Sequence, residues 1–115
     1  EDLAYVIPLR DATPGALLVS AGDATQGTLL AITTNGTAII TLMNAAGYDL
    51  MTLGNHEFDK GPVPAAELAG QAEFPVLSAN TFYANGTPLF GNDGSLIIET
   101  GGKRIGFFGV TTTEN

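Results

Sequence analysis

The stretch LMTLGNHEFD, residues 50–59, is the one around which this chain is organised. Its first four residues are mostly apolar and predict a buried strand over 50–53. The loop that follows places an amide, an imidazole and two carboxylates within five residues, and its histidine, His56, is the only one in the sequence. Such groups can bind a metal, donate a proton and orient one another. Taken alone, an Asn-His pair is more typical of a polar turn that exposes a histidine, and only the other motifs of the chain reverse this interpretation.

Length and composition predict one globular unit. The chain has 115 residues, of which 44% are apolar, and this is enough for a single core. Its net charge of -8 argues against a nucleic-acid polymer or an anionic membrane as partner, and fits a bound cation better. Because there is no cysteine, a metal would have to be held by oxygen and imidazole ligands.

The ends of the sequence and its apolar runs bear on processing. No apolar run reaches the roughly 18 residues of a membrane span. The chain starts at Glu1, without Met or a signal-like segment. We therefore expect a processed or excised piece of a longer protein.

Two further apolar runs resemble the one before the central loop. Residues 16–21 end at Gly22-Asp23, and residues 76–79 end at Asn80. Both read as strands, and residues 16–21 as a strand buried on both faces. Asp23 and Asn55 are about 30 residues apart, which is the length of a right-handed strand-helix-strand unit. We therefore expect Asp23, the Asn55 loop and Asn80 to gather at one edge of a parallel sheet.

Helices are expected between these strands. Residues 37–48 carry apolar side chains at helical spacing and end in a glycine, and Gly61-Pro62 opens a helix over 63–72. Residues 28–34 predict a shorter helix. Near the start, Asp2 could cap a helix, and this helix would tolerate Pro8 only in its first turn.

The C-terminal part predicts a loop followed by an antiparallel ribbon. Residues 81–95 show no period and no evident chemistry. Residues 96–100 and 103–110 flank Gly101-Gly102, a pair suited to a two-residue hairpin turn, and we place this hairpin at the end of the sheet. The fold class is therefore α/β, in three or more layers, with a mostly parallel sheet, crossover helices and a C-terminal antiparallel hairpin.

Four short motifs together resemble a known family. They are Gly22-Asp23 after a strand, Gln26-Gly27, the hexapeptide of residues 54–59, and Ser78-Ala79-Asn80. In this order and spacing they resemble the metallophosphoesterases of the calcineurin-like superfamily. The similarity is greatest to the 5'-nucleotidase and 2',3'-cyclic-nucleotide phosphodiesterase branch, and it runs over residues 3–112.

The resemblance implies roles for four side chains. Asp23 would bridge two divalent metal ions. Asn55 would ligate the second metal through its amide oxygen and lie near the substrate phosphate. His56 would contact the phosphate rather than a metal and stabilise its developing charge, and Asp59 would orient the imidazole.

Three neighbouring residues have no implied chemistry. Glu57 and Phe58 are interpreted as structural. Asn80 has a matching position in the branch but no firm role, and helix or loop capping is the favoured interpretation.

The sequence also departs from the family pattern. The family's first metal motif, Asp-x-His, and its later histidines have no counterpart here. Residues 1–115 would therefore be a partial catalytic domain, inactive as a separate chain. The parent would use two divalent ions, with Mn, Zn, Mg, Ca and Fe all open, on a small nucleotide or phosphate ester. The resemblance implies a periplasmic, extracellular or cell-surface location.

Two other functions stay open. The chain could be a folded but catalytically silent module that binds cations weakly or associates with other chains through an uncovered sheet surface. A hydrolase of thiosulfate esters in the same superfamily would also resemble this set of motifs.

Overall fold

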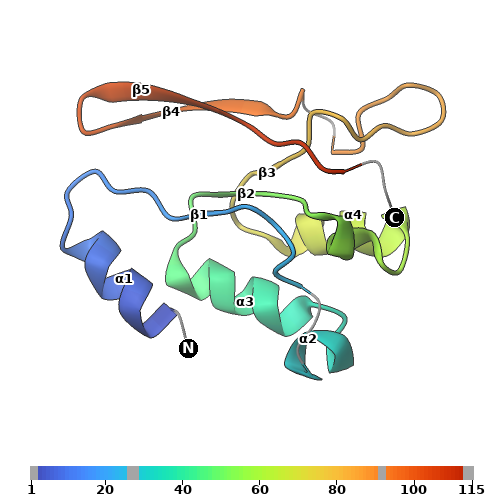
Figure 1. Ribbon diagram of the computed structural model, residues 1–115, viewed down its shortest axis with the longest axis horizontal. Helices are drawn as coiled ribbons and strands as arrows, with labels where there is room; N and C mark the ends of the chain where they lie inside the picture. Colours follow the sequence, from blue (N-terminus) through green and yellow to red (C-terminus); the bar gives the residue numbers. More distant parts are fainter. Residues whose placement is uncertain (1–2, 26–28, 91–92, 113–115) are drawn as a thin grey trace.

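Three parallel strands form the centre of the molecule (Figure 1). The computed structural model describes residues 3–25, 29–90 and 93–112. The strands β1 (Val19–Ser20), β2 (Leu50–Thr52) and β3 (Val76–Leu77) lie in the order β1-β2-β3. Both neighbouring pairs are parallel. The predicted parallel sheet, with these three segments adjacent, is therefore confirmed.

The prediction for the first strand was wrong in its length and burial. β1 has two residues rather than the six of 16–21, and the side chain of Val19 is 45% exposed. Among the described strands β1 pairs only with β2, so it is an edge strand and one of its faces is less covered than in a central strand. The chain around it is held by Asp49, whose carboxylate accepts a hydrogen bond from the Leu18 N–H at 2.8 Å.

Two crossover helices complete the core. α3 (Thr37–Ala46) connects β1 to β2 and α4 (Pro62–Gln71) connects β2 to β3, as predicted. Gly47 ends α3 with a φ of +77°, which is the left-handed conformation that glycine adopts at little cost. The buried cluster joins both helices to the sheet and consists of Ile40, Met43, Met51, Leu53, Leu68, Phe74 and Val76.

The first two short helices lie outside this core. α1 (Leu3–Asp11) contains Pro8 in its interior, so the prediction of a first-turn proline was wrong. Proline there removes one intrahelical hydrogen bond. α1 buries none of its side chains and is anchored by Arg10, whose guanidinium donates to the carbonyls of Ala46 at 2.8 Å and Gly47 at 3.0 Å. α2 (Leu29–Thr33) confirms the short helix, while Asp2 and Thr28 lie outside the described residues.

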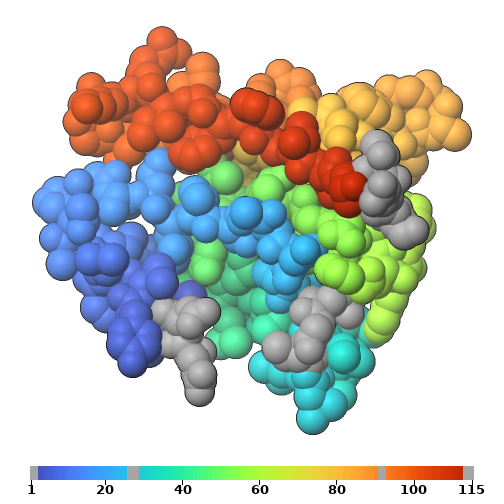
Figure 2. Space-filling model, viewed as in Figure 1, coloured from blue at the N-terminus to red at the C-terminus, as the bar shows by residue number. Residues whose placement is uncertain are grey.

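A two-stranded hairpin forms a separate layer. β4 (Ser95–Thr100) and β5 (Lys103–Phe108) are antiparallel, and Gly101 and Gly102 have φ values of +56° and +76°, as a two-residue turn requires. We had placed the hairpin at the end of the parallel sheet, and this prediction was wrong, because β4 and β5 form a two-stranded sheet of their own. The hairpin lies on the side of the strands opposite α1 and α3, and in Figure 2 it forms the upper edge of the molecule together with the gold segment that follows β3.

Close backbone contact determines this position. The Ala79 N–H donates to the Gly109 carbonyl at 2.7 Å, just after β5. A Cβ atom on Gly109 would lie 2.1 Å from Thr52 Oγ1, so only glycine lets β5 end against the parallel strands. The result is three layers: helices, parallel sheet and hairpin.

Candidate functional site

The loops after β1 and β2 touch each other at the carboxyl edge of the sheet, and two glycines make this possible. A Cβ atom on Gly22 would lie 2.2 Å from the Gly54 nitrogen, and a Cβ on Gly54 would lie 2.0 Å from Asp23 Oδ1. Gly22 has a φ of +97° and Asp23 a φ of +56°, which is rare for a residue with a side chain. The two Gly-containing motifs of the sequence are thus the places where the two loops meet.

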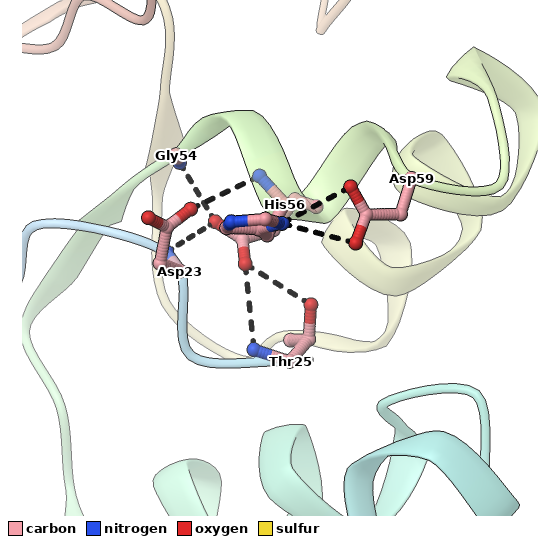
Figure 3. A network of polar contacts seen from close by, with 6 residues as sticks. Asp23, Thr25, Gly54, His56 and Asp59 are labelled. Carbon is pink, nitrogen blue, oxygen red and sulfur yellow. Dashed lines mark hydrogen bonds and ion pairs between the residues drawn. The ribbon is translucent and has the colours of Figure 1, made fainter. Parts of the chain in front are cut away.

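The side chain of Glu57 links these two loops by hydrogen bonds. Its side chain is only 3% exposed. Oε1 accepts hydrogen bonds from the Asp23 N–H at 2.6 Å and the Gly54 N–H at 2.7 Å. Oε2 accepts from the Thr25 hydroxyl at 3.1 Å and from the Thr25 N–H at 3.3 Å (Figure 3). The structural interpretation of Glu57 is confirmed, and Phe58 packs against the core cluster as expected.

His56 lies between two carboxylates. It belongs to the short 3-10 helix η1 (Asn55–Phe58), and its backbone N–H donates to Asp23 Oδ1 at 3.0 Å. On the other side of His56 in Figure 3, ring atom Nδ1 faces Asp59 and lies 3.1 and 3.2 Å from its two carboxylate oxygens. The predicted contact between His56 and Asp59 is therefore present. Their chemical roles stay a prediction.

The charge around His56 favours its protonated form. The hydrogen bond to Asp59 raises the pKa of His56 above its usual value, and the negative charge of Asp59 adds to this. Asp23 and Glu57 raise this pKa further, while partial desolvation opposes them. With Nδ1 bonded to Asp59, Nε2 is the ring nitrogen that makes no hydrogen bond with any described residue.

Two oxygen donors lie on the touching loops. Asp23 is exposed, and its Oδ2 makes no hydrogen bond within the described ranges. The side chain of Asn55 is half-buried and is likewise without a hydrogen bond to any residue described. A carboxylate and an amide oxygen suit hard divalent cations. Over residues 3–25, 29–90 and 93–112, however, no group of three or more His, Asp or Glu side chains could hold a metal ion.

Asn80 follows β3 at the same edge but is used differently. Its Nδ2 donates to the Thr111 carbonyl at 2.7 Å, and its Oδ1 accepts from the Thr111 N–H at 3.0 Å. This amide ties two segments of chain together rather than capping a helix. Thr25 was not predicted as part of this site, because no pattern in the sequence distinguishes it from its neighbours. Gln26 and Gly27 lie outside the described residues.

Several known proteins are similar to this chain in sequence. No family model matches the sequence. The chain is 44% identical over 107 residues to a probable 5'-nucleotidase of Treponema pallidum, which covers 92% of this chain and 18% of that protein. It is 40% identical over 103 residues to a snake venom 5'-nucleotidase of Gloydius brevicauda, which covers 85% of this chain and 17% of that protein.

Solved structures show the same fold. The NAD nucleotidase NadN of Haemophilus influenzae matches with a TM-score of 0.83 and 34% identity, over 98% of this chain and 23% of that one. The calcineurin-like phosphoesterase YfkN of Bacillus subtilis matches with a TM-score of 0.77 and 28% identity, over 95% and 38%. The chain belongs to the calcineurin-like phosphoesterase and 5'-nucleotidase family.

The family includes members with other names. The sulfate thiohydrolase SoxB of Thermus thermophilus matches this calcineurin-like chain with a TM-score of 0.83 and 25% identity, over 97% of this chain and 21% of that one. The chain spans about a fifth of the length of the curated relatives named above. No helix in the part of the chain that is described is long and apolar enough to cross a membrane.

Proposed function

We propose that the protein containing this segment is a metal-dependent phosphoesterase of the 5'-nucleotidase type, and that residues 1–115 are part of its catalytic domain. The observation that carries the proposal is the contact between two loops, one with Asp23 and the other with Asn55 and the His56–Asp59 pair. Its substrate would be a small 5'-nucleotide or a related phosphate ester. The names of the relatives support this substrate class.

Asp23 and Asn55 are the residues that would hold divalent metal ions. Asp23 Oδ2 and the Asn55 amide oxygen are available as ligands, because neither makes a hydrogen bond to a described residue. Two such donors fit part of a metal site, which the described residues do not complete, and the remaining ligands would come from elsewhere in the full-length protein. Bound metals would supply an activated water and offset the charge of the phosphate. Mn, Zn, Mg, Ca and Fe are all compatible with oxygen and imidazole donors.

His56 would bind the phosphate of the substrate. Asp59 accepts a hydrogen bond from the Nδ1–H of His56, which fixes the ring and leaves Nε2 to donate a hydrogen bond to a phosphate oxygen. As negative charge builds up on that oxygen, a fixed imidazolium stabilises it more than mobile water would. The raised pKa of His56 keeps this donor protonated at higher pH than a free histidine.

Two alternatives are retained. The likeness to SoxB supports a thiosulfate-ester substrate, because the groups on these loops would contact the metals and the transferred group rather than the rest of the substrate. The segment could also be catalytically silent, with only weak cation binding. For location we propose export from the cytoplasm, which the snake venom relative supports.

The test uses the full-length protein. After removal of metal by a chelator, we expect hydrolysis of a 5'-nucleotide to return with a divalent ion. His56→Ala should lower turnover about 10²- to 10³-fold with unchanged metal content. Asp23→Ala should reduce both.

Glu67→Ala is the matched control, because it removes one exposed carboxylate from α4 that makes no hydrogen bond or ion pair with any described residue. It should leave turnover and metal content unchanged. Metal-independent hydrolysis, or full activity of His56→Ala, would overturn the proposal. Faster turnover of a thiosulfate ester would select the first alternative, and no turnover of either substrate would select the second.

A further inference from the structure

The buried carboxylate of Glu57 has no chemical role in the function proposed above, yet it makes more hydrogen bonds than any group near it. All four come from N–H groups or a hydroxyl, and none comes from a Lys or Arg side chain. A buried charge is costly unless it is well hydrogen-bonded. The fold therefore uses two backbone N–H groups of the Asp23 loop, together with that of Gly54, to hold one acid.

These hydrogen bonds act on the residues that carry the proposed ligands. Glu57 Oε1 holds the backbone of Asp23 at 2.6 Å, and Asp23 Oδ1 in turn accepts the His56 N–H at 3.0 Å. The chain thus forms a closed loop of contacts from Glu57 to Asp23 to His56 and back. Asp23 has a φ of +56°, which a residue with a side chain keeps only when its surroundings hold it there.

We propose that Glu57 is a positioning residue for the metal ligands. It fixes the left-handed backbone of Asp23, and therefore the direction of the Asp23 carboxylate, relative to the turn that carries Asn55. This proposal rests on the proposed function and deepens it. Glu57 itself is not a ligand, because its side chain is 3% exposed and both of its oxygens already accept hydrogen bonds.

The chemistry of the clamp requires a carboxylate. Three of the four groups that face Glu57 are N–H groups, which can only donate. Glutamine could keep its oxygen towards Asp23 and Gly54, but its NH₂ group would then face the Thr25 N–H. The Thr25 hydroxyl can turn and accept, so glutamine should retain part of the clamp. Alanine should retain none.

The experiment measures metal affinity and local protection in the full-length protein. Mn²⁺ binding to the metal-free protein is measured by calorimetry, and hydrogen exchange is followed by mass spectrometry over residues 22–25 and 53–58. Groups that orient a metal ligand typically change affinity about 10- to 100-fold when removed. We expect a loss in this range for Glu57→Ala, a smaller loss for Glu57→Gln, and the smallest for Thr25→Val, which removes one of the four bonds. Exchange of both segments should accelerate in the same order.

Met43→Ala is the matched control for stability, because it weakens the buried core without touching the clamp. It should lower the unfolding temperature while leaving Mn²⁺ affinity unchanged. Wild-type Mn²⁺ affinity and unchanged exchange in a folded Glu57→Ala or Glu57→Gln variant would overturn the proposal. If Glu57→Ala fails to fold, the glutamine and Thr25→Val variants decide. A wild-type protein that binds none of Mn²⁺, Zn²⁺, Mg²⁺, Ca²⁺ and Fe²⁺ would refute the proposed function instead, and exchange over residues 22–25 would still decide whether Glu57 holds the loop.

Discussion

The loop pair after β1 and β2 and the loop after β3 leave the sheet at the same edge but use their polar side chains in opposite ways. In the first pair, the buried Glu57 satisfies the backbone, so Asp23 Oδ2 and the Asn55 amide make no hydrogen bond within the described residues. After β3, Asn80 itself satisfies the backbone of Thr111 through two hydrogen bonds.

This difference shows why one polar side chain stays available for binding while another is occupied by hydrogen bonds to the backbone. A polar residue at the carboxyl end of a parallel strand is well placed for chemistry. It remains available only if another group satisfies the backbone around it. Glu57 accepts hydrogen bonds from the backbone of two loops at once. After β3, among the residues described, Asn80 itself bonds to the backbone. The predictions below test this distinction, beginning with the largest effect.

The largest effect concerns the isolated 115-residue chain, which should show no phosphatase or nucleotidase turnover with any divalent metal. Its loops offer two oxygen donors, and two metal ions held close together need several ligands each to offset their repulsion. The measurement is turnover by the purified chain beside the full-length protein. Metal-dependent turnover that disappears in His56→Ala would show that other chains or unforeseen ligands complete the site.

The next effect concerns close contact between the two loops. Gly54→Ala would place a Cβ atom 2.0 Å from Asp23 Oδ1, so one loop must move. We expect a loss of about 1–3 kcal/mol in the free energy of unfolding, together with weaker metal binding. Gly70→Ala is the control, because no atom lies within 4 Å of its added Cβ and it sits in α4. It should stabilise the protein by about 0.5–1 kcal/mol. Equal effects in urea unfolding would show that the loops do not constrain each other.

The third prediction separates the two asparagines. Asn80→Ala removes both hydrogen bonds to Thr111 and should cost about 1 kcal/mol in the free energy of unfolding, with unchanged metal affinity. Asn55→Ala removes no side-chain hydrogen bond within the described residues, so it should change stability little but weaken metal binding. Calorimetric metal titration and urea unfolding of both variants check this. A swap of the two phenotypes would break the comparison between these loops.

Much of the fold follows from local patterns in the sequence. The apolar runs before Gly22, Gly54 and Asn80 place three strands, and Gly47 and Pro62 mark helix ends, because these signals depend on neighbours in the chain. Strand length and the hairpin's position do not follow from them. β1 is short because β2 is the only described strand that pairs with it. The hairpin forms its own layer because Gly109 meets Thr52, a contact between residues far apart in the sequence.

The site divides in the same way. The pairing of His56 with Asp59 is local, since the two residues are three positions apart, and it could be predicted. The clamp could not, because Glu57 bonds to Asp23 and Thr25, more than thirty residues earlier. Nothing in the sequence distinguishes a buried glutamate that accepts these bonds from an exposed one. Asn80 was expected at this edge with a capping role and no assigned chemistry, and its hydrogen bonds to Thr111, which lies 31 positions later, could likewise not be predicted.

The smallest effect is a pH dependence of the His56–Asp59 pair. Hydrogen bonding and charge from Asp59 raise the folded-state pKa of His56 above its usual 6.5. A raised folded pKa means that the pair stabilises the protein fully below the unfolded pKa, as long as Asp59 is ionised, and that this stabilisation is lost as pH rises through the folded pKa. Both side chains are about half exposed, so salt should weaken the effect. We expect Asp59→Asn to lower the pKa of His56, as read by NMR from the imidazole resonance that is absent in His56→Ala. In Asp23→Asn, which changes a weaker contribution, the pKa should fall less. An unchanged pKa in Asp59→Asn would show that the contact between the two side chains does not govern the protonation of His56.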